Sequence, residues 1–134
     1  MAGKYLLDTH AFLWATSDMS GVSKLGGHAK EAIADMESAL FVSSISLFEI
    51  SYKYRNGKLP EYKAIAENVF AALYGLGAEE LLLNWIHAQL AGCLDWPHKD
   101  PFDRMLAAQA QTEGLTLITC DGAFDTAPSL STLW

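Results

Sequence analysis

Short apolar runs alternate with longer stretches of helical periodicity along the whole chain. Continuous apolar runs are typical of strands that are buried on both faces, and they predict strands at residues 4–7, 40–42 and 115–120, with further candidates at 80–83 and 131–134. Apolar positions spaced three and four residues apart predict helices at 11–15, 28–37, about 44–55, 62–74, 85–93 and 101–113. A loop is predicted from Ser20 and Gly21 to Gly26 and Gly27.

This alternation favours an α/β fold, a three-layer α/β/α sandwich with a mostly parallel central sheet. Right-handed crossovers between parallel strands bring the carboxyl ends of the strands to one edge of the sheet. Ligands of such folds bind outside that edge. The residues that follow each strand are therefore the candidates for function.

Acidic residues occupy those positions. Asp8 closes the first strand and Asp121 closes the strand at 115–120, while Glu49 lies shortly after the strand at 40–42. Asp103 opens the helix at 101–113. Four carboxylates at one edge would repel one another unless a divalent cation held them, and oxygen ligands suit hard ions such as Mg²⁺ or Mn²⁺. The pattern predicts a metal-dependent enzyme that acts on phosphate esters.

Each acid also has a structural explanation. Asp8 is a candidate helix cap, and Ser46 with Glu49 fits the spacing of a capping box. Asp100-Pro101-Phe102-Asp103 is typical of a helix start, and Asp121-Gly122 of a turn. The conjunction favours the metal site, because caps need neither follow apolar strands nor converge at one edge of a sheet.

Composition limits the remaining possibilities. The chain of 134 residues is long enough for one domain, which we place at 1–134, and its formal charge of −7 excludes binding of nucleic acid by overall charge. Contact with a polyanion then requires local basic side chains, and the candidates are Lys53, Arg55, Lys99 and Arg104.

Cys93 and Cys120 are predicted to be buried free thiols. No apolar run approaches the ~20 residues of a membrane span, so we expect no membrane association and a cytoplasmic location.

Four blocks of the chain, at residues 5–14, 43–50, 98–106 and 117–121 with Phe124, resemble the PIN-domain ribonucleases, specifically the VapC-type toxins of bacterial toxin–antitoxin pairs. The resemblance implies a PIN-like fold, endoribonuclease activity that depends on Mg²⁺ or Mn²⁺, and a small cognate antitoxin as partner. It implies catalytic and metal-binding roles for Asp8, Glu49, Asp103 and Asp121. We also expect a homodimer.

Two positions depart from the family pattern. Cys120 stands where a basic or polar residue often precedes the fourth acid, and Asp125 adds an acid after it, as an outer ligand or a surface charge. Two alternatives from other classes remain. A receiver-like signalling domain that binds Mg²⁺ would need an acidic neighbour for Asp8 and a Lys after Asp121, and both are absent. A catalytically silent antitoxin-binding module would be expected to lack at least one of the four acids.

Overall fold

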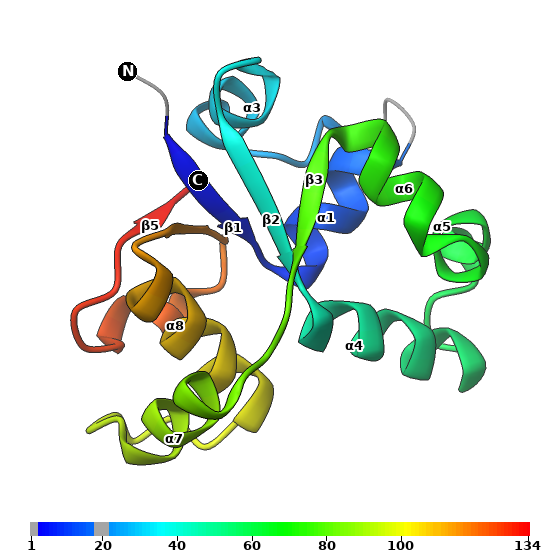
Figure 1. Ribbon diagram of the computed structural model, residues 1–134. Coiled ribbons are helices and arrows are strands. Elements are labelled where there is room, and N and C mark those ends of the chain that lie inside the picture. The colour runs from blue at the N-terminus through cyan, green and yellow to red at the C-terminus, as the bar shows by residue number, and fades with distance from the viewer. Residues whose placement is uncertain (1–2, 18–21) are drawn as a thin grey trace.

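The computed structural model describes residues 3–17 and 22–134, so the predicted loop at Ser20 and Gly21 lies outside the described residues. In the described part, five parallel strands form one sheet in the order β3-β2-β1-β4-β5 (Figure 1). The strands are β1 (Lys4–Leu7), β2 (Ala39–Ser43), β3 (Ala78–Leu81), β4 (Thr116–Ile118) and β5 (Thr132–Leu133). The predicted parallel sheet is confirmed.

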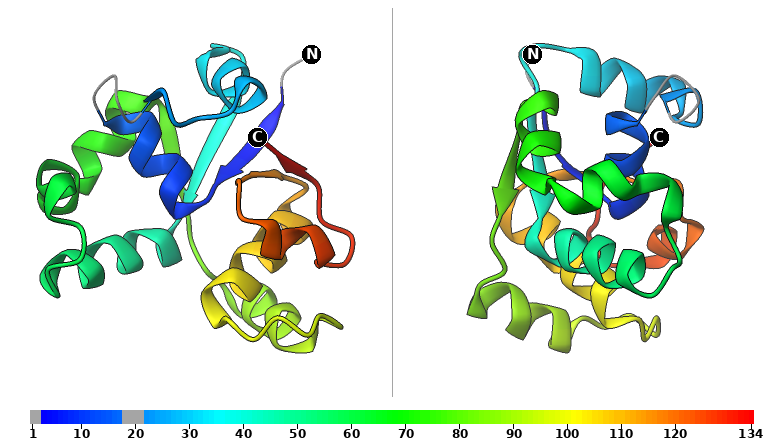
Figure 2. Two further views of the ribbon diagram at one scale, coloured as in Figure 1. Left: turned by 180° about the vertical axis from the view of Figure 1, so that it is seen from behind. Right: turned by 90° about the vertical axis from the view of Figure 1, so that its right-hand side faces the viewer.

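Helices cover both faces of this sheet, as the two further views in Figure 2 show. The α-helices are α1 (Thr9–Thr16), α3 (Gly27–Ala34), α4 (Ser44–Arg55), α5 (Lys63–Glu67), α6 (Val69–Leu76), α7 (Trp85–Cys93) and α8 (Pro101–Glu113). The described residues also contain two short 3-10 helices, η1 (Pro60–Tyr62) between α4 and α5 and η2 (Gly122–Thr126) between β4 and β5. None of the described helices is long and apolar enough to cross a membrane.

Neighbouring residues of each central strand enter different cores, because successive side chains of a strand point to opposite faces. Leu7 and Ile118 pack with α1, α3 and α4 on one face of the sheet. Leu6 and Leu117 pack with α8 and η2 on the other face. All four side chains are fully buried. The two cores confirm the three-layer α/β/α sandwich.

The strand predicted at 115–120 is shorter, at Thr116–Ile118, and the helix predicted at 28–37 already ends at Ala34. Two other predicted elements differ more. The helix expected at 62–74 is broken at Asn68, whose backbone (φ −145°, ψ 73°) is not helical and whose side chain accepts a hydrogen bond from Ala71 N to start α6. A turn-forming amide competes with helix continuation there, and periodicity alone does not register it. The strand expected at 80–83 lies two residues earlier, at Ala78–Leu81, because its register follows the pairing of Ala78 with Leu40 on β2.

The two cysteines are free, as predicted, but both are exposed and not buried. Cys93 is the last residue of α7. Cys120 lies past the end of β4, beside the cavity described below. The prediction of burial was wrong because the apolar neighbours of each cysteine in the sequence face the core, whereas the cysteine itself does not.

The position of β1 sets the location of a ligand site. β1 pairs with β2 on one side and with β4 on the other, so the strand order reverses there. In open parallel sheets a crevice forms at such a reversal, outside the carboxyl ends of the strands. Asp8 follows β1 directly, and Thr119 to Asp121 follow β4.

Candidate active site

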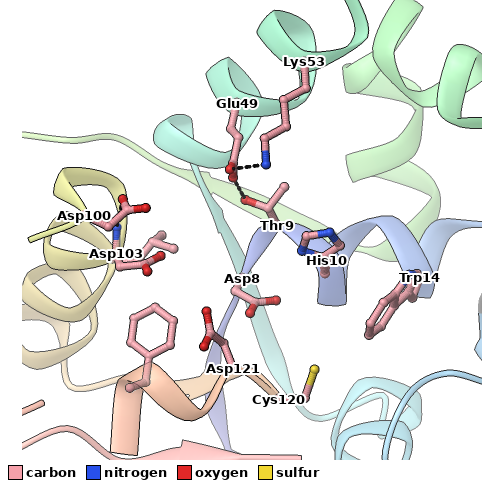
Figure 3. A pocket seen from close by; sticks show the side chains of 12 residues that line it. Asp8, Thr9, His10, Trp14, Glu49, Lys53, Asp100, Asp103, Cys120 and Asp121 are labelled. Carbon is pink, nitrogen blue, oxygen red and sulfur yellow. Dashed lines mark hydrogen bonds and ion pairs between the residues drawn. The ribbon is translucent and has the colours of Figure 1, made fainter. Parts of the chain in front are cut away.

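A cavity of about 380 Å³ lies at this edge of the sheet. Its lining contains carboxylates from separate elements, namely Asp8, Glu49, Asp100, Asp103 and Asp121. Figure 3 shows that the acids of α8 enter from one side, Glu49 from α4, and Asp8 and Asp121 from the strand ends. The structure thus brings together the four acids singled out in the sequence, and adds Asp100.

Asp8 is held rigidly by both of its oxygens. Oδ1 accepts a hydrogen bond from Ala11 N at 2.8 Å, which caps α1, and Oδ2 accepts one from the Thr119 hydroxyl at 2.5 Å. The Thr119 oxygen also accepts from Asp121 N at 3.1 Å. Thr119 therefore connects the acid after β1 with the acid after β4. Asp8 is both a helix cap and a cavity residue.

Burial raises the pKa of two of these acids. Asp8 is only 9% exposed, and its burial raises the carboxyl pKa more than the hydrogen bonds from Thr119 and Ala11 lower it. Burial likewise raises the pKa of Asp103, against the opposing hydrogen bond with His98. The nearby negative charge of Asp121 adds to both shifts. These are carboxylates whose negative charge lacks full compensation from the protein.

Glu49 bridges α4 and α1. Its Oε1 accepts from the Thr9 hydroxyl at 2.6 Å, and its Oε2 lies 2.8 Å from the Lys53 ammonium one turn further along α4. The capping-box alternative is wrong, because α4 begins at Ser44 with Ser43 as its N-cap, so Glu49 lies inside the helix. Its carboxylate faces the cavity and the first helix.

His98 and Arg104 surround Asp103. Nε2 of His98 lies 2.7 Å from Oδ2 of Asp103, and the imidazole packs against Trp96 with 4.8 Å between ring centroids. The Arg104 guanidinium donates to four backbone carbonyl oxygens, those of Ala91, Leu94, Trp96 and His98, at 2.6 to 3.0 Å. This fork holds the segment before α8 in place and so fixes His98 beside Asp103.

The predicted RNA-binding cations thus have different surroundings. Lys53 lines the cavity, and Arg55 and Lys99 are exposed. Arg104 directs its guanidinium to the carbonyl oxygens named above, which leaves it little capacity for phosphate. RNA contact stays a prediction for Lys53, Arg55 and Lys99. For Arg104 we infer a structural role, which is to hold the segment before α8.

In the described part of the chain, no group of three or more His, Cys, Asp or Glu side chains is arranged so that it could hold a metal ion. The reason is visible in the contacts, since the carboxylates bond instead to threonine, lysine and histidine. The chemistry of the donor set nevertheless fits a hard divalent cation, because it consists of carboxylate oxygens and the charges of Asp8 and Asp103 are incompletely compensated. Binding would require Glu49 to exchange the Lys53 ammonium for the ion.

The sequence prediction missed the partners that orient the acids, Thr9 and Thr119. A signal existed, because each is a hydroxyl residue at the end of an apolar strand, with Thr9 directly after Asp8 and Thr119 two residues before Asp121. It was weak, since threonine is common at strand ends and its contact spans 40 residues in one case and 111 in the other.

Comparison with known families gives the identity of the fold. The PIN domain family model matches residues 5–130, so the chain belongs to the PIN domain family. Among curated proteins, none matches the sequence.

Solved structures with the same fold come from toxin–antitoxin systems. VapBC2 from Rickettsia felis, bound to a promoter DNA fragment, is similar with a TM-score of 0.70 and 21% identity over 97% of both chains. DNA-bound VapBC from Salmonella typhimurium gives a TM-score of 0.68 and 19% identity, covering 98% of this chain and 97% of that one. VapC20 from Mycobacterium tuberculosis, described as a sarcin–ricin loop cleaving toxin, gives 0.59 and 18%, covering 90% and 92%.

The raised pKa of Asp8 predicts a pH-dependent stability. A carboxyl whose pKa is raised on folding favours the folded state below its unfolded pKa, and this contribution is lost as pH rises through the folded pKa. Asp8→Asn keeps an oxygen for Ala11 N, loses the acceptor for the Thr119 hydroxyl, and has no charge to bury. In EDTA at pH 7 we expect it to melt a few degrees above the wild type, with the difference shrinking as pH falls toward 4.

Differential scanning fluorimetry across pH measures this difference. Asp35→Asn is the matched control, because Asp35 is exposed and its oxygen receives the backbone N–H of Glu37, which asparagine retains. A lower melting temperature for Asp8→Asn at pH 7 would show that the surroundings stabilise the charged carboxylate.

Proposed function

We propose that this chain is a divalent-metal-dependent endoribonuclease that hydrolyses RNA phosphodiester bonds, and that it is the toxin of a VapC-type toxin–antitoxin pair. The proposal rests on one observation. In a chain of the PIN family, one cavity is lined by four acids, Asp8, Glu49, Asp103 and Asp121. The similar structures support the toxin assignment, since they include VapBC complexes and a toxin described as cleaving the sarcin–ricin loop.

The four carboxylates would hold Mg²⁺ or Mn²⁺, and such an ion supplies a bound water of lowered pKa and neutralises phosphate oxygens. The chain itself orients the donor set, because Thr119 fixes one oxygen of Asp8 and Thr9 one oxygen of Glu49. The Lys53 ammonium lines the same cavity and can contact a phosphate oxygen there. His98 holds one oxygen of Asp103 and leaves the other toward the cavity.

The PIN family match over residues 5–130 leaves no support for a receiver-like domain. A catalytically silent antitoxin-binding module would have the same fold, so only a measurement of cleavage separates it from a nuclease.

Cleavage of RNA should depend on both metal and acids. Chain treated with EDTA should leave total bacterial RNA intact, and added Mn²⁺ should produce discrete fragments on a sequencing gel. Asp103→Asn removes one charge of the donor set with little change in size, and we expect the rate to fall on the order of a hundredfold or more.

The control for that experiment is again Asp35→Asn, which should cleave at the wild-type rate because Asp35 is not part of the cavity lining. Cleavage undiminished in EDTA would contradict the metal-dependent mechanism. A wild-type chain that cuts no RNA with either Mg²⁺ or Mn²⁺ would favour the silent module.

A small antitoxin is the proposed protein partner. α1 and α6 border a groove lined by Ala15, Thr16, Ala71, Ala72, Gly75 and Leu76, so its lining within residues 3–17 and 22–134 has no charged side chain. On the same helix α6, the rings of Phe70 and Tyr74 are stacked and largely exposed. An apolar groove bordered by exposed aromatics suits the amphipathic segment of a partner.

Co-expression with the short protein encoded beside this chain should yield a complex that no longer cleaves RNA. Tyr74→Arg places a charge on the groove edge and should prevent co-purification, while the isolated variant keeps wild-type cleavage because Tyr74 lies outside the cavity. A variant that still forms an inhibited complex would place the partner elsewhere.

The homodimer also stays a prediction. Leu82, Trp85 and Ile86, between β3 and the first turn of α7, are exposed and apolar, so they offer surface for a second copy. Sedimentation velocity should show a species of twice the 14.6 kDa chain, and Trp85→Arg should convert it to monomer. A wild-type monomer at tens of micromolar would exclude the dimer.

A further inference from the structure

A second hollow lies beside the acidic cavity, on the neighbouring face of α4. The rings of Phe48 and Tyr52 stack there with centroids 5.6 Å apart and planes at 23°, and Phe102 of α8 approaches Phe48 to 5.8 Å. Phe48 is 53% exposed and Tyr52 58% exposed. Flat aromatic surface of this extent is costly to leave in water, so it indicates a binding surface.

This groove, of about 430 Å³, adjoins the acidic cavity, because Glu49 and Lys53 line both hollows. It extends past the end of α4 to Asn56 and Lys58. A ligand bound at the four acids therefore has the aromatic rings as its neighbouring surface.

The charges around the rings indicate the chemistry of the ligand. Lys53 and Lys58 line the groove together with one acid, Glu49, which already pairs with Lys53. The aromatic pair on α6 differs in this respect, since the described residues that line the groove next to it are uncharged. The α4 groove thus suits a ligand with flat apolar faces and negative charge, and the α6 groove suits an apolar one.

We propose that Phe48 and Tyr52, with Phe102 behind them, form a stacking subsite for an unpaired base of the RNA close to the bond that is cut. Lys53 and Lys58 contact the phosphates on either side of that base. Aromatic stacking is how proteins hold bases of single-stranded RNA. The subsite rests on the proposed nuclease function, and it makes the substrate single-stranded at this point.

The test compares two fluorescent RNA oligomers of equal length, one of adenylate and one with the same backbone but no bases. Binding is measured by anisotropy with Mn²⁺ in an Asp103→Asn background, which slows cleavage so that the oligomers stay intact during the measurement. Phe48→Leu/Tyr52→Leu removes the flat rings but keeps apolar side chains on the helix. Phe70→Leu/Tyr74→Leu is the matched control, because that pair has the same spacing and the same interplanar angle of 23°.

We expect the α4 double variant to weaken binding of oligoadenylate about tenfold, which corresponds to about 1.4 kcal/mol. Binding of the abasic oligomer should not change, and the α6 control should bind both as the parent does. Equal weakening for both oligomers, or no weakening, overturns the subsite.

Sedimentation velocity of the same proteins tests whether a second copy of the chain, and not RNA, binds the aromatic face of α4. A parent dimer that the α4 substitutions alone convert to monomer would show that this face joins two copies of the chain, and would overturn the proposal. The nuclease assignment fails separately, if wild-type chain cuts no RNA. Metal-dependent cleavage without base-dependent binding at α4 overturns the subsite alone.

Discussion

The hydroxyl of Thr119 donates to the carboxylate of Asp8, and this hydrogen bond joins the ends of the two strands at which the sheet order reverses. The same oxygen accepts from the backbone of Asp121 and so positions the second acid. Asp8 N also bonds to Ile118 O at 3.1 Å, and its other oxygen starts α1. The parallel pairing of β1 with β4 therefore determines where two acids of the cavity lie. α4 and α8 then add Glu49 and Asp103 by packing against opposite faces of that sheet.

This arrangement concentrates negative charge where the protein compensates it incompletely. Burial outweighs hydrogen bonding at Asp8 and Asp103, so the pKa of each is raised. The threonines fix carboxylate oxygens without adding a positive charge, which leaves the charge available to a cation. Lys53 is the cationic partner that an ion would have to replace. The threonines thus orient the carboxylates, while the burial of Asp8 and Asp103 leaves negative charge that a cation can compensate.

The sequence predicted β1, α7 and α8 with the observed bounds, because local signals mark their ends. Asp100 and Pro101 start α8, and Gly114 at φ 66° ends it. It failed where the deciding contact is distant or where local signals conflict, as at Asn68 inside the expected helix. The convergence of the acids followed from parallel topology, whereas Thr119 could not be linked to Asp8 without the fold, since 111 residues separate them. Arg104 illustrates the same limit, because a cation beside an acid in sequence is bound to carbonyl oxygens of another segment.

An acidic chain of charge −7 can still approach RNA if its helices sort their side chains by face. α4 does this with three pairs at i, i+4, which lie on common stripes because an α-helix turns about 100° per residue. Ser46 and Ile50 are buried against the core. Glu49 and Lys53 form the next stripe, at the acidic cavity, and Phe48 and Tyr52 the stripe beyond it. The periodicity that anchors the helix thus places the aromatic rings next to the acids, so that cutting and holding of a strand would depend on the orientation of one helix.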